Sequence, residues 1–366
     1  MHIVARNRAW SPAVEQLPEG TVHRMPPWRR IGRRMDTLLG FPAFFSPRWI
    51  AHIGSVIRRV RAELLIVRDM PLAPTAISAA RRAGIPIFLD MAEHYPAMMQ
   101  QLFDAGRARP IDYVVRNPKA VQAVDRYVIP RVDRILIVVE EMGERLLAAG
   151  IPANRLVLVS NTPPRARAER PSMSHADGDR VPEVVHLGNL EVPRGLGVLI
   201  EAAAMLRHTP QRVRLKIIGD GRDGTLFRDQ ARTLGLSEQD VEFTGRVPSH
   251  EDALAMVARA DIGAIPQHVN TQTENIITNK LFDYMAAGLP VVTSDARPSA
   301  RIVRETMCGE IFHDRDARDL AGALVRLSGA DERHRAGEAG RHAVLDRYNW
   351  EQDTGRLLEA IADFGA

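Results

Sequence analysis

A lysine and an aspartate share one face of a short helical segment late in the chain, ITNKLFDYMAAGLPVV at residues 277–292. The spacing predicts a helix from about Lys280 to Ala287, which Gly288 and Pro290 end. Its buried stripe is predicted to consist of Leu281, Phe282, Met285 and Ala286. Asn279, Lys280 and Asp283 lie on the other face. They form either a solvated Lys–Asp pair, contributing roughly a few tenths of a kcal/mol, or a binding face. In the second interpretation Lys280 contacts phosphate and Asp283 accepts hydrogen bonds from a ribose.

A second candidate lies about 90 residues earlier, where the loop GNLEVPRGLG (188–197) joins a predicted strand to a predicted helix. The loop carries Arg194. Free backbone N–H groups at a helix N-terminus, with a guanidinium close by, form an anion site suited to a phosphate or diphosphate. The alternative is a solvated arginine. Neither segment by itself shows whether its charged residues bind a ligand or are only solvated.

The elements that would position these residues alternate between short apolar strands and amphipathic helices. ELLIVRD (63–69), IPIFLDM (85–91) and RILIVVE (134–140) are typical of buried parallel strands. A polar segment rich in Pro and Arg follows at 161–182 and predicts an interdomain linker or a mobile loop. The pattern then restarts with the predicted strands EVVHLG, VRLKIIGDG and VEFTGRV. Two such series predict an α/β protein of two Rossmann-like domains, with the ligand in the cleft between them.

Length and composition agree with that organisation. The 366 residues suffice for two domains, and 45% apolar with 26% charged residues is typical of a globular protein. No apolar run reaches the roughly 18–20 residues that span a bilayer, and no secretory signal opens the chain. The single cysteine, Cys308, excludes an internal disulfide and suits a reducing cytoplasm. We therefore expect a cytoplasmic protein.

The net charge of +4 is unevenly distributed. Residues 23–61 combine many arginines with five aromatic residues, Trp28, Phe41, Phe44, Phe45 and Trp49. Such a segment suits an anionic membrane surface, where aromatic rings sit at the headgroup level. The alternative is an arginine-rich helical hairpin whose aromatic residues lie in the core. No nucleic-acid-binding motif is present, so nucleic acid is not an expected partner.

Taken together, the spaced elements resemble a known family. GNLEVPRGLG, IIGDG, FTGRV and NKLFDYMAAGLPVV, in this order, resemble the donor domain of the retaining GT-B glycosyltransferases of family 4. The resemblance covers nearly the whole chain and is strongest over 183–350. It includes RYNWEQ (347–352), similar to the segment that leads a last helix back to the first domain. It implies an N-terminal acceptor-side domain (1–165), a linker (166–182), a C-terminal donor domain (183–347) and a returning helix (348–366).

The resemblance implies roles for the donor-side residues. Arg194 and Lys280 would hold the diphosphate of a nucleotide sugar, and Asp283 would bind the ribose hydroxyls. Gly221 and the backbone around Val247 would flank the nucleobase. The remaining donor-side candidates are Gly188, Asn189, Gly195, Asn279 and Leu281. No metal or other cofactor is expected, because two cations and a helix N-terminus can stabilise the diphosphate charge.

On the acceptor side, FLDMAEHYP (88–96) resembles the family segment that contains a histidine near the acceptor, although Ala92 stands at that position. Asp90, Glu93 and His94 are then the catalytic candidates: Glu93 as acid or base toward the acceptor hydroxyl, His94 as a hydrogen-bond donor to the sugar. Alternatively these three residues cap the next helix. Arg68, in RDMPL, is a candidate for contacting an anionic acceptor.

Two further departures from the family pattern concern the donor. Asp283 stands where the family usually has Glu, and Glu274 lies nine positions before it instead of eight, which leaves Asn275 at the partner position. Asn189 replaces the basic residue that often follows the first loop glycine. The family also normally has a strand, a glycine-bearing loop and a helix before the strand that MHIVARN resembles. We therefore expect roughly 30–40 additional N-terminal residues, the size of a βαβ unit.

The implied activity is transfer of a sugar from a nucleotide-diphosphate sugar to a saccharide or polyprenyl-linked saccharide, with retention of anomeric configuration. Retaining hydrolases use two carboxylates about 5–5.5 Å apart, and no such pair is evident in the sequence. In the family the leaving diphosphate helps to deprotonate the acceptor. The alternative is a non-catalytic nucleotide-sugar-binding or scaffold protein. A nicotinamide-dependent dehydrogenase is disfavoured because no G-x-G-x-x-G follows a strand.

Overall fold

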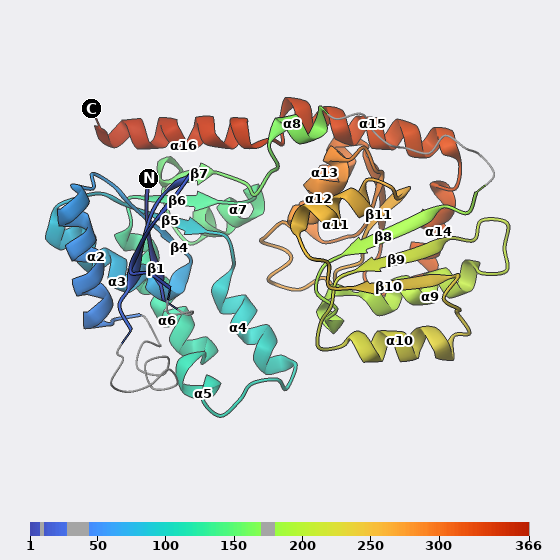
Figure 1. Cartoon of the computed structure of the whole chain (residues 1–366), viewed down its shortest axis with the longest axis horizontal. Coiled ribbons are helices and arrows are strands. Elements are labelled where there is room, and N and C mark those ends of the chain that lie inside the picture. The colour runs from blue at the N-terminus through green and yellow to red at the C-terminus, as the bar shows by residue number, and fades with distance from the viewer. Residues whose placement is uncertain (8–10, 28–43, 170–179, 366) are drawn as a thin grey trace. The chain divides into compact units, whose positions relative to one another are not determined.

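The computed structural model describes residues 1–7, 11–27, 44–169 and 180–365, which form two compact units (Figure 1). The N-terminal unit consists of residues 1–137, 143–158 and 359–366, and the C-terminal unit of residues 138–142 and 159–358. No described helix combines the length and apolar character needed to cross a bilayer. Both units contain parallel sheets with helices between successive strands, so the predicted α/β class is confirmed.

The N-terminal unit contains two sheets. Four parallel strands have the order β4-β5-β6-β7, with bounds Leu65–Arg68, Ile87–Met91, Arg134–Ile137 and Leu156–Leu158. The predicted strands at 63–69, 85–91 and 134–140 are thus confirmed. The predicted first strand is β1 (His2–Arg6), and it pairs with β3 (Gly20–Met25) beside β2 (Val14–Leu17), in a separate sheet of order β1-β3-β2. The helices are α2 (Pro47–Val60), α3 (Ala73–Ala83), α4 (Tyr95–Asp104), α5 (Asp112–Val115), α6 (Pro118–Val128) and α7 (Glu140–Ala148).

Helix α2 corrects part of the membrane interpretation. Ser46 caps it by accepting a hydrogen bond from the Trp49 backbone N–H, and Trp49 is only 2% exposed in a core cluster with Ile53 and Ile57. Trp49 therefore cannot contact lipid, because the helix must bury its apolar face against the sheet and α3. Phe45 is 55% exposed, whereas Trp28 and Phe41 lie outside the described residues.

The C-terminal unit is built on one sheet of six parallel strands, in the order β10-β9-β8-β11-β12-β13. The bounds are β8 (Glu183–Leu187), β9 (Arg214–Ile218), β10 (Val241–Gly245), β11 (Ile262–Ile265), β12 (Val291–Ser294) and β13 (Gly309–Phe312). Numbered along the chain this is the order 3-2-1-4-5-6 of dinucleotide-binding sheets. The connections turn in opposite directions between β8 and β11. In such sheets ligands bind beyond the carboxyl ends of the strands at that switch point.

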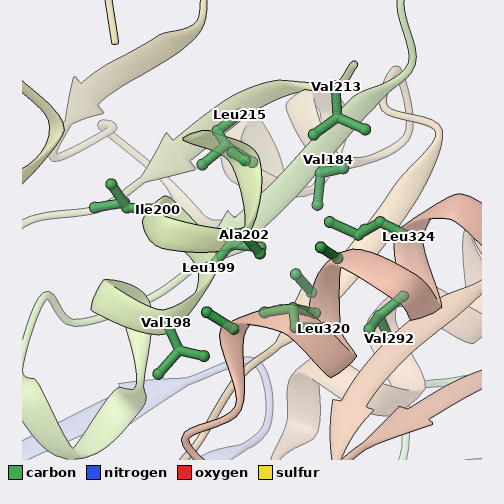
Figure 2. Close-up of a cluster of buried hydrophobic side chains, with 14 of the residues drawn as sticks. Val184, Val198, Leu199, Ile200, Ala202, Val213, Leu215, Val292, Leu320 and Leu324 are labelled. Carbon is green, nitrogen blue, oxygen red and sulfur yellow. The ribbon is translucent and has the colours of Figure 1, made fainter. Parts of the chain in front are cut away.

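Helices cover both faces of this sheet. On one face α9 (Leu196–Leu206) and α14 (Ala317–Arg326) pack over Val184, Leu215 and Val292 in a large core cluster (Figure 2). Helix α12 (Asn279–Ala286) covers the other face, where its Tyr284 packs on Gly263 of β11. Ile262 and Ala264, on either side of Gly263, point to the first face, because successive strand residues alternate between the two faces. The remaining helices are α8 (Arg165–Ala168), α10 (Gly224–Thr233), α11 (His250–Val257), α13 (Arg297–Thr306) and α15 (Ala330–Asp346).

Short-range interactions define two helices of this unit. Ser249 caps α11 by accepting the Asp252 N–H at 3.0 Å. Helix α12 runs over Asn279–Ala286, within one residue of the prediction, and all four residues of its predicted apolar stripe are at most 2% exposed. The last helix, α16 (Trp350–Gly365), begins in the C-terminal unit, and its residues from Glu359 on belong to the N-terminal unit.

A buried carboxylate fastens the start of α16. Asp353 is fully buried and accepts the Ser160 N–H at 3.0 Å, the Thr162 hydroxyl, and an Arg356 N–H at 2.5 Å. A buried carboxylate is tolerated only when such donors replace its water, and the donors become unsatisfied if it is removed.

We therefore expect Asp353→Ala to lower the free energy of unfolding of the C-terminal unit by about 3–5 kcal/mol. Urea denaturation followed by circular dichroism would measure the change. Glu359→Ala, at an exposed position of the same helix, should change the value by less than about 0.5 kcal/mol. Equal losses for the two variants would contradict the role of Asp353.

Candidate functional site

The loop between β8 and α9 lies at the switch point of the C-terminal sheet. Arg194 ends a short 3-10 turn, Val192–Arg194, and Gly195 is the N-cap of α9. Gly195 has φ 69°, and a Cβ there would lie 1.6 Å from the Pro266 carbonyl oxygen. Only glycine fits this position. The turn thus sets Arg194 beside the N-terminus of α9, as the sequence predicted for an anion site.

Lys280 reaches the same place from α12. Its ammonium fills the space beside Gly188, where a Cβ would lie 2.6 Å from Lys280 Nζ. Tyr284, one turn further along α12, is fully buried and accepts the Leu187 N–H at 3.0 Å. This bond holds α12 against the end of β8. The two segments that were singled out in the sequence, 188–197 and 277–292, are therefore brought together.

The charge of this site is unbalanced. Burial, together with the positive charge of Arg194, lowers the pKa of Lys280 to about 7. Lys216, in contrast, pairs with Glu183 at 2.8 Å. Within the described part of the chain no carboxylate forms an ion pair with Lys280 or Arg194. Two neighbouring cations in a partly desolvated site are unfavourable unless an anion joins them.

A histidine lies beneath the two cations. His186 in β8 is 1% exposed, and its Nδ1 lies 3.2 Å from the Ala264 carbonyl oxygen at the end of β11. Its pKa is well below the usual value because of burial and the positive charges of Lys280 and Arg194. The imidazole is therefore neutral, and it bridges the two strands that define the switch point.

Asp283 faces a different neighbour. It is 7% exposed and pairs with Arg167 of α8 at 2.9 Å, so the solvated Lys280–Asp283 pair considered from the sequence does not form. Burial raises the pKa of Asp283 against the opposing effect of Arg167. Both residues line a cavity of 270 Å³ whose other walls come mainly from α11 and α12.

The other donor-side candidates surround these residues. Asn189 is exposed in the β8–α9 loop and Asn279 is exposed at the start of α12, whereas Leu281 is buried. Gly221 follows β9, and its N–H binds Asp220 Oδ1 at 2.8 Å. Val247 follows β10 and is partly buried.

Glu274 and Asn275, where the chain departs from the family pattern, are engaged locally. Glu274 Oε1 accepts the N–H of Arg297, the first residue of α13, at 3.1 Å. Asn275 donates to the Thr271 carbonyl oxygen at 2.8 Å. In this structure, therefore, both side chains satisfy nearby backbone groups.

The N-terminal unit carries a separate group of titratable residues where β4 and β5 end. Arg68 pairs with Asp90 at 2.9 Å, so the predicted acceptor contact and one predicted catalytic carboxylate are bound to each other. Burial raises the pKa of Asp90 and also that of the adjacent Asp69. Asp69 has φ 57° and ψ 174°, a conformation that costs a non-glycine residue about 1–3 kcal/mol.

Glu93 and His94 lie in the turn that leads from β5 into α4. The negative charge of Glu93 contributes to the raised pKa of Asp69. His94 is the N-cap residue of α4, but its side chain makes no capping hydrogen bond. Ala92 is 8% exposed, and its N–H binds the Asp69 carboxylate. The turn thus places the candidate residues Asp90 and Glu93 where their charges act on Asp69, which was not a candidate from the sequence.

Four contributors to these sites were missed from the sequence: His186, Tyr284, Arg167 and Asp69. A polar residue inside the apolar strand EVVHLG was a usable signal for His186. For Tyr284 the signal was Gly263, since a glycine within a strand often marks the close approach of another group. Arg167 lies in the predicted linker, where nothing distinguishes it from neighbouring arginines.

Comparisons with known families agree with this geometry. The family model described as glycosyl transferases group 1 matches residues 181–329, and the one described as glycosyl transferase 4-like domain matches residues 1–162. The C-terminal match therefore contains the β8–α9 loop and α12, and the N-terminal match contains the β4 and β5 ends.

Individual relatives match part of the chain. A phosphatidyl-myo-inositol mannosyltransferase of Mycobacterium leprae is 35% identical over 50% of this chain and 48% of its own length. A GDP-mannose-dependent alpha-(1-6)-phosphatidylinositol monomannoside mannosyltransferase of Mycolicibacterium smegmatis is 32% identical over 54% of this chain and 52% of its own length. The chain thus spans about half the length of these curated relatives.

A solved structure extends the fold comparison to the whole chain. The Anabaena protein HepE, in complex with UDP-glucose, superposes with a TM-score of 0.70 at 14% identity, over 99% of this chain and 100% of its own. That likeness concerns the fold. Together with the two family models it confirms the resemblance found in the sequence: the chain belongs to the group 1 glycosyl transferases of family 4, which have the GT-B fold.

Proposed function

We propose that this protein is a glycosyltransferase that takes a nucleotide-diphosphate sugar as its donor. The observation that carries the proposal is a pair of cations, Arg194 and Lys280, that has no carboxylate partner among the described residues and lies at the N-terminus of α9 and the switch point of the C-terminal sheet. A diphosphate would supply the missing negative charge, with further hydrogen bonds from backbone N–H groups of α9. This arrangement needs no metal ion to neutralise the leaving group.

The proposed reaction retains the configuration at the anomeric carbon. The bond between that carbon and the diphosphate oxygen breaks, and the acceptor hydroxyl oxygen forms a bond on the same face. The acceptor proton passes to the departing diphosphate. Arg194 and Lys280 stabilise the charge that develops on this leaving group, an electrostatic contribution that is often the largest in catalysis.

The acceptor proposed is a saccharide or lipid-linked saccharide. The named mannosyltransferase relatives act on phosphatidylinositol-based acceptors, which makes a membrane-bound acceptor the first to test. Peripheral contact with an anionic cytoplasmic membrane surface is part of this proposal. It is supported by exposed Phe45 together with exposed Arg58 and Arg59 on α2.

Donor binding can be tested through Lys280. Among GDP-mannose, UDP-glucose and ADP-glucose, one donor should raise the melting temperature, because a ligand that binds the native state stabilises it. In Lys280→Ala the loss of a charge-assisted hydrogen bond should weaken binding about tenfold or more and remove this shift. Lys119→Ala, at an exposed position of the N-terminal unit, is the matched control. A shift that survives in Lys280→Ala would remove Lys280 from the diphosphate site.

Turnover separates the enzyme from a binding protein of the same fold. With the stabilising donor, transfer is measured to an acceptor presented in vesicles with and without anionic lipid. Binding without transfer or donor hydrolysis would favour the scaffold alternative, for which Ala92 and the Arg68–Asp90 ion pair are the supporting observations. Equal rates on the two vesicle types would contradict the membrane contact.

The lowered pKa of Lys280 predicts proton uptake on donor binding. In the free protein Lys280 loses its proton as the pH rises through about 7. The diphosphate raises this pKa again, so binding at pH 8 must recharge the lysine, and affinity should fall as the pH rises above 7. Calorimetry in two buffers of different ionisation enthalpy at pH 8 would show an uptake approaching one proton. Lys280→Arg, which stays charged, should bind without it. Equal uptake by both proteins would contradict the prediction.

The proposed role of Asp283 predicts a dependence on the ribose. If Asp283 leaves Arg167 to accept hydrogen bonds from the ribose, Asp283→Ala should weaken binding of a nucleoside diphosphate roughly tenfold. It should change binding of the corresponding 2′,3′-dideoxy nucleotide little, since that ligand lacks the hydroxyls. Titration calorimetry with both ligands measures the difference. An equal loss for the two would exclude Asp283 from ribose binding.

A further inference from the structure

His186 is a polar side chain in a place that otherwise holds apolar ones. It lies in β8 among strand residues such as Val184 and Ile217, which belong to the main core, and it is 1% exposed. Because the Ala264 carbonyl can only accept, the Nδ1 that lies 3.2 Å from it carries the proton. The Nε2 of the neutral ring is then a hydrogen-bond acceptor, and it is buried without a partner among the described residues.

An unsatisfied buried acceptor costs roughly as much as a lost hydrogen bond, so its surroundings indicate what it serves. The charged groups that act on the His186 ring are Lys280 of α12, which has the larger effect, and Arg194 of the β8–α9 loop. Lys280 Nζ lies against Gly188, two residues beyond His186 and directly after the end of β8. In the described part of the structure this ammonium likewise has no hydrogen-bond acceptor, and its flexible four-carbon stem lets it turn.

We propose that His186 is a positioning residue for Lys280: its Nε2 accepts a hydrogen bond from the lysine ammonium when that group turns from its place beside Gly188, and it keeps the ammonium in the site until an anion takes it over. This deepens the proposed function, because Lys280 is there the diphosphate ligand. The Nδ1–H bond to Ala264 orients the ring, and the switch-point strands β8 and β11 are thereby coupled to the lysine. An arginine or lysine at position 186 could not do this, and an apolar residue would leave the ammonium unsupported.

The consequence is measurable without any ligand. A neutral acceptor stabilises the charged form of the lysine against burial and the repulsion of Arg194. Removing the acceptor in His186→Phe should therefore lower the titration midpoint of Lys280 by about one pH unit or more. His186→Gln offers an amide oxygen as a replacement acceptor and should keep the midpoint near the wild-type value.

The chain has only three lysines, Lys119, Lys216 and Lys280, so the full-length protein labelled with 13C at lysine Cε should give three resolvable NMR signals. Lys280→Arg identifies the Lys280 signal by removing it. The wild-type signal should titrate near pH 7, the Phe variant at lower pH and the Gln variant close to wild type. The same Lys280 midpoint in wild type and His186→Phe would overturn the proposal.

Unchanged Lys119 and Lys216 signals would show that His186→Phe folds. If that variant does not fold, a second measurement tests the proposal on the wild-type protein. In 15N-histidine spectra of the wild-type protein, the unprotonated Nε2 of His186 should shift as Lys280 titrates, and Lys280→Arg should abolish that step. If the Nε2 chemical shift does not change as Lys280 titrates, the proposal is overturned. If the titrations behave as expected but no nucleoside diphosphate binds, the proposed function fails while the His186–Lys280 pairing stands.

Discussion

Two neighbouring positive charges, with no carboxylate partner among the described residues, are the constraint on which the C-terminal unit's site depends. Lys280 and Arg194 come from different elements, and their mutual repulsion is reflected in the lowered pKa of the lysine. A protein retains such an arrangement only if other contacts enforce it. The Tyr284 bond to Leu187 and the close approach at Gly188 do so, because they leave α12 no freedom to carry Lys280 away. The repulsion between the two cations is unfavourable in the free protein. The same two charges are complementary to an anionic ligand.

The N-terminal unit presents the opposite electrostatic problem. Asp69 and Asp90 are held where burial raises the pKa of each carboxyl, and Arg68 partly offsets their charge. Asp69 also adopts an unfavourable backbone conformation. Raised carboxyl pKa values and backbone strain both concentrate at functional sites. The C-terminal unit therefore holds two neighbouring cations, and the N-terminal unit holds carboxyl groups whose pKa is raised.

Much of this could be predicted from the residues. The alternation of apolar strands and amphipathic helices indicated two α/β series, and the buried stripe of α12 follows the predicted pattern. These features depend on neighbours within a few positions, where periodicity and turn chemistry operate. Trp49 was harder to interpret, because an aromatic residue among arginines suits a membrane surface and a core equally well. Only the packing of α2 places it in the core.

The sequence by itself determined the fold class, the order of the family motifs and the presence of cations suited to an anion site. Tertiary structure alone decided which groups become partners. Arg167 and Asp283 pair across 116 residues, and Leu187 and Tyr284 across 97. No periodicity reaches that far, since such contacts arise only when the sheet brings distant segments to one switch point. The same packing places His186, a polar residue within an apolar strand, where the charge of Lys280 acts on it. It also separates Lys280 from Asp283, which pairs with Arg167 instead.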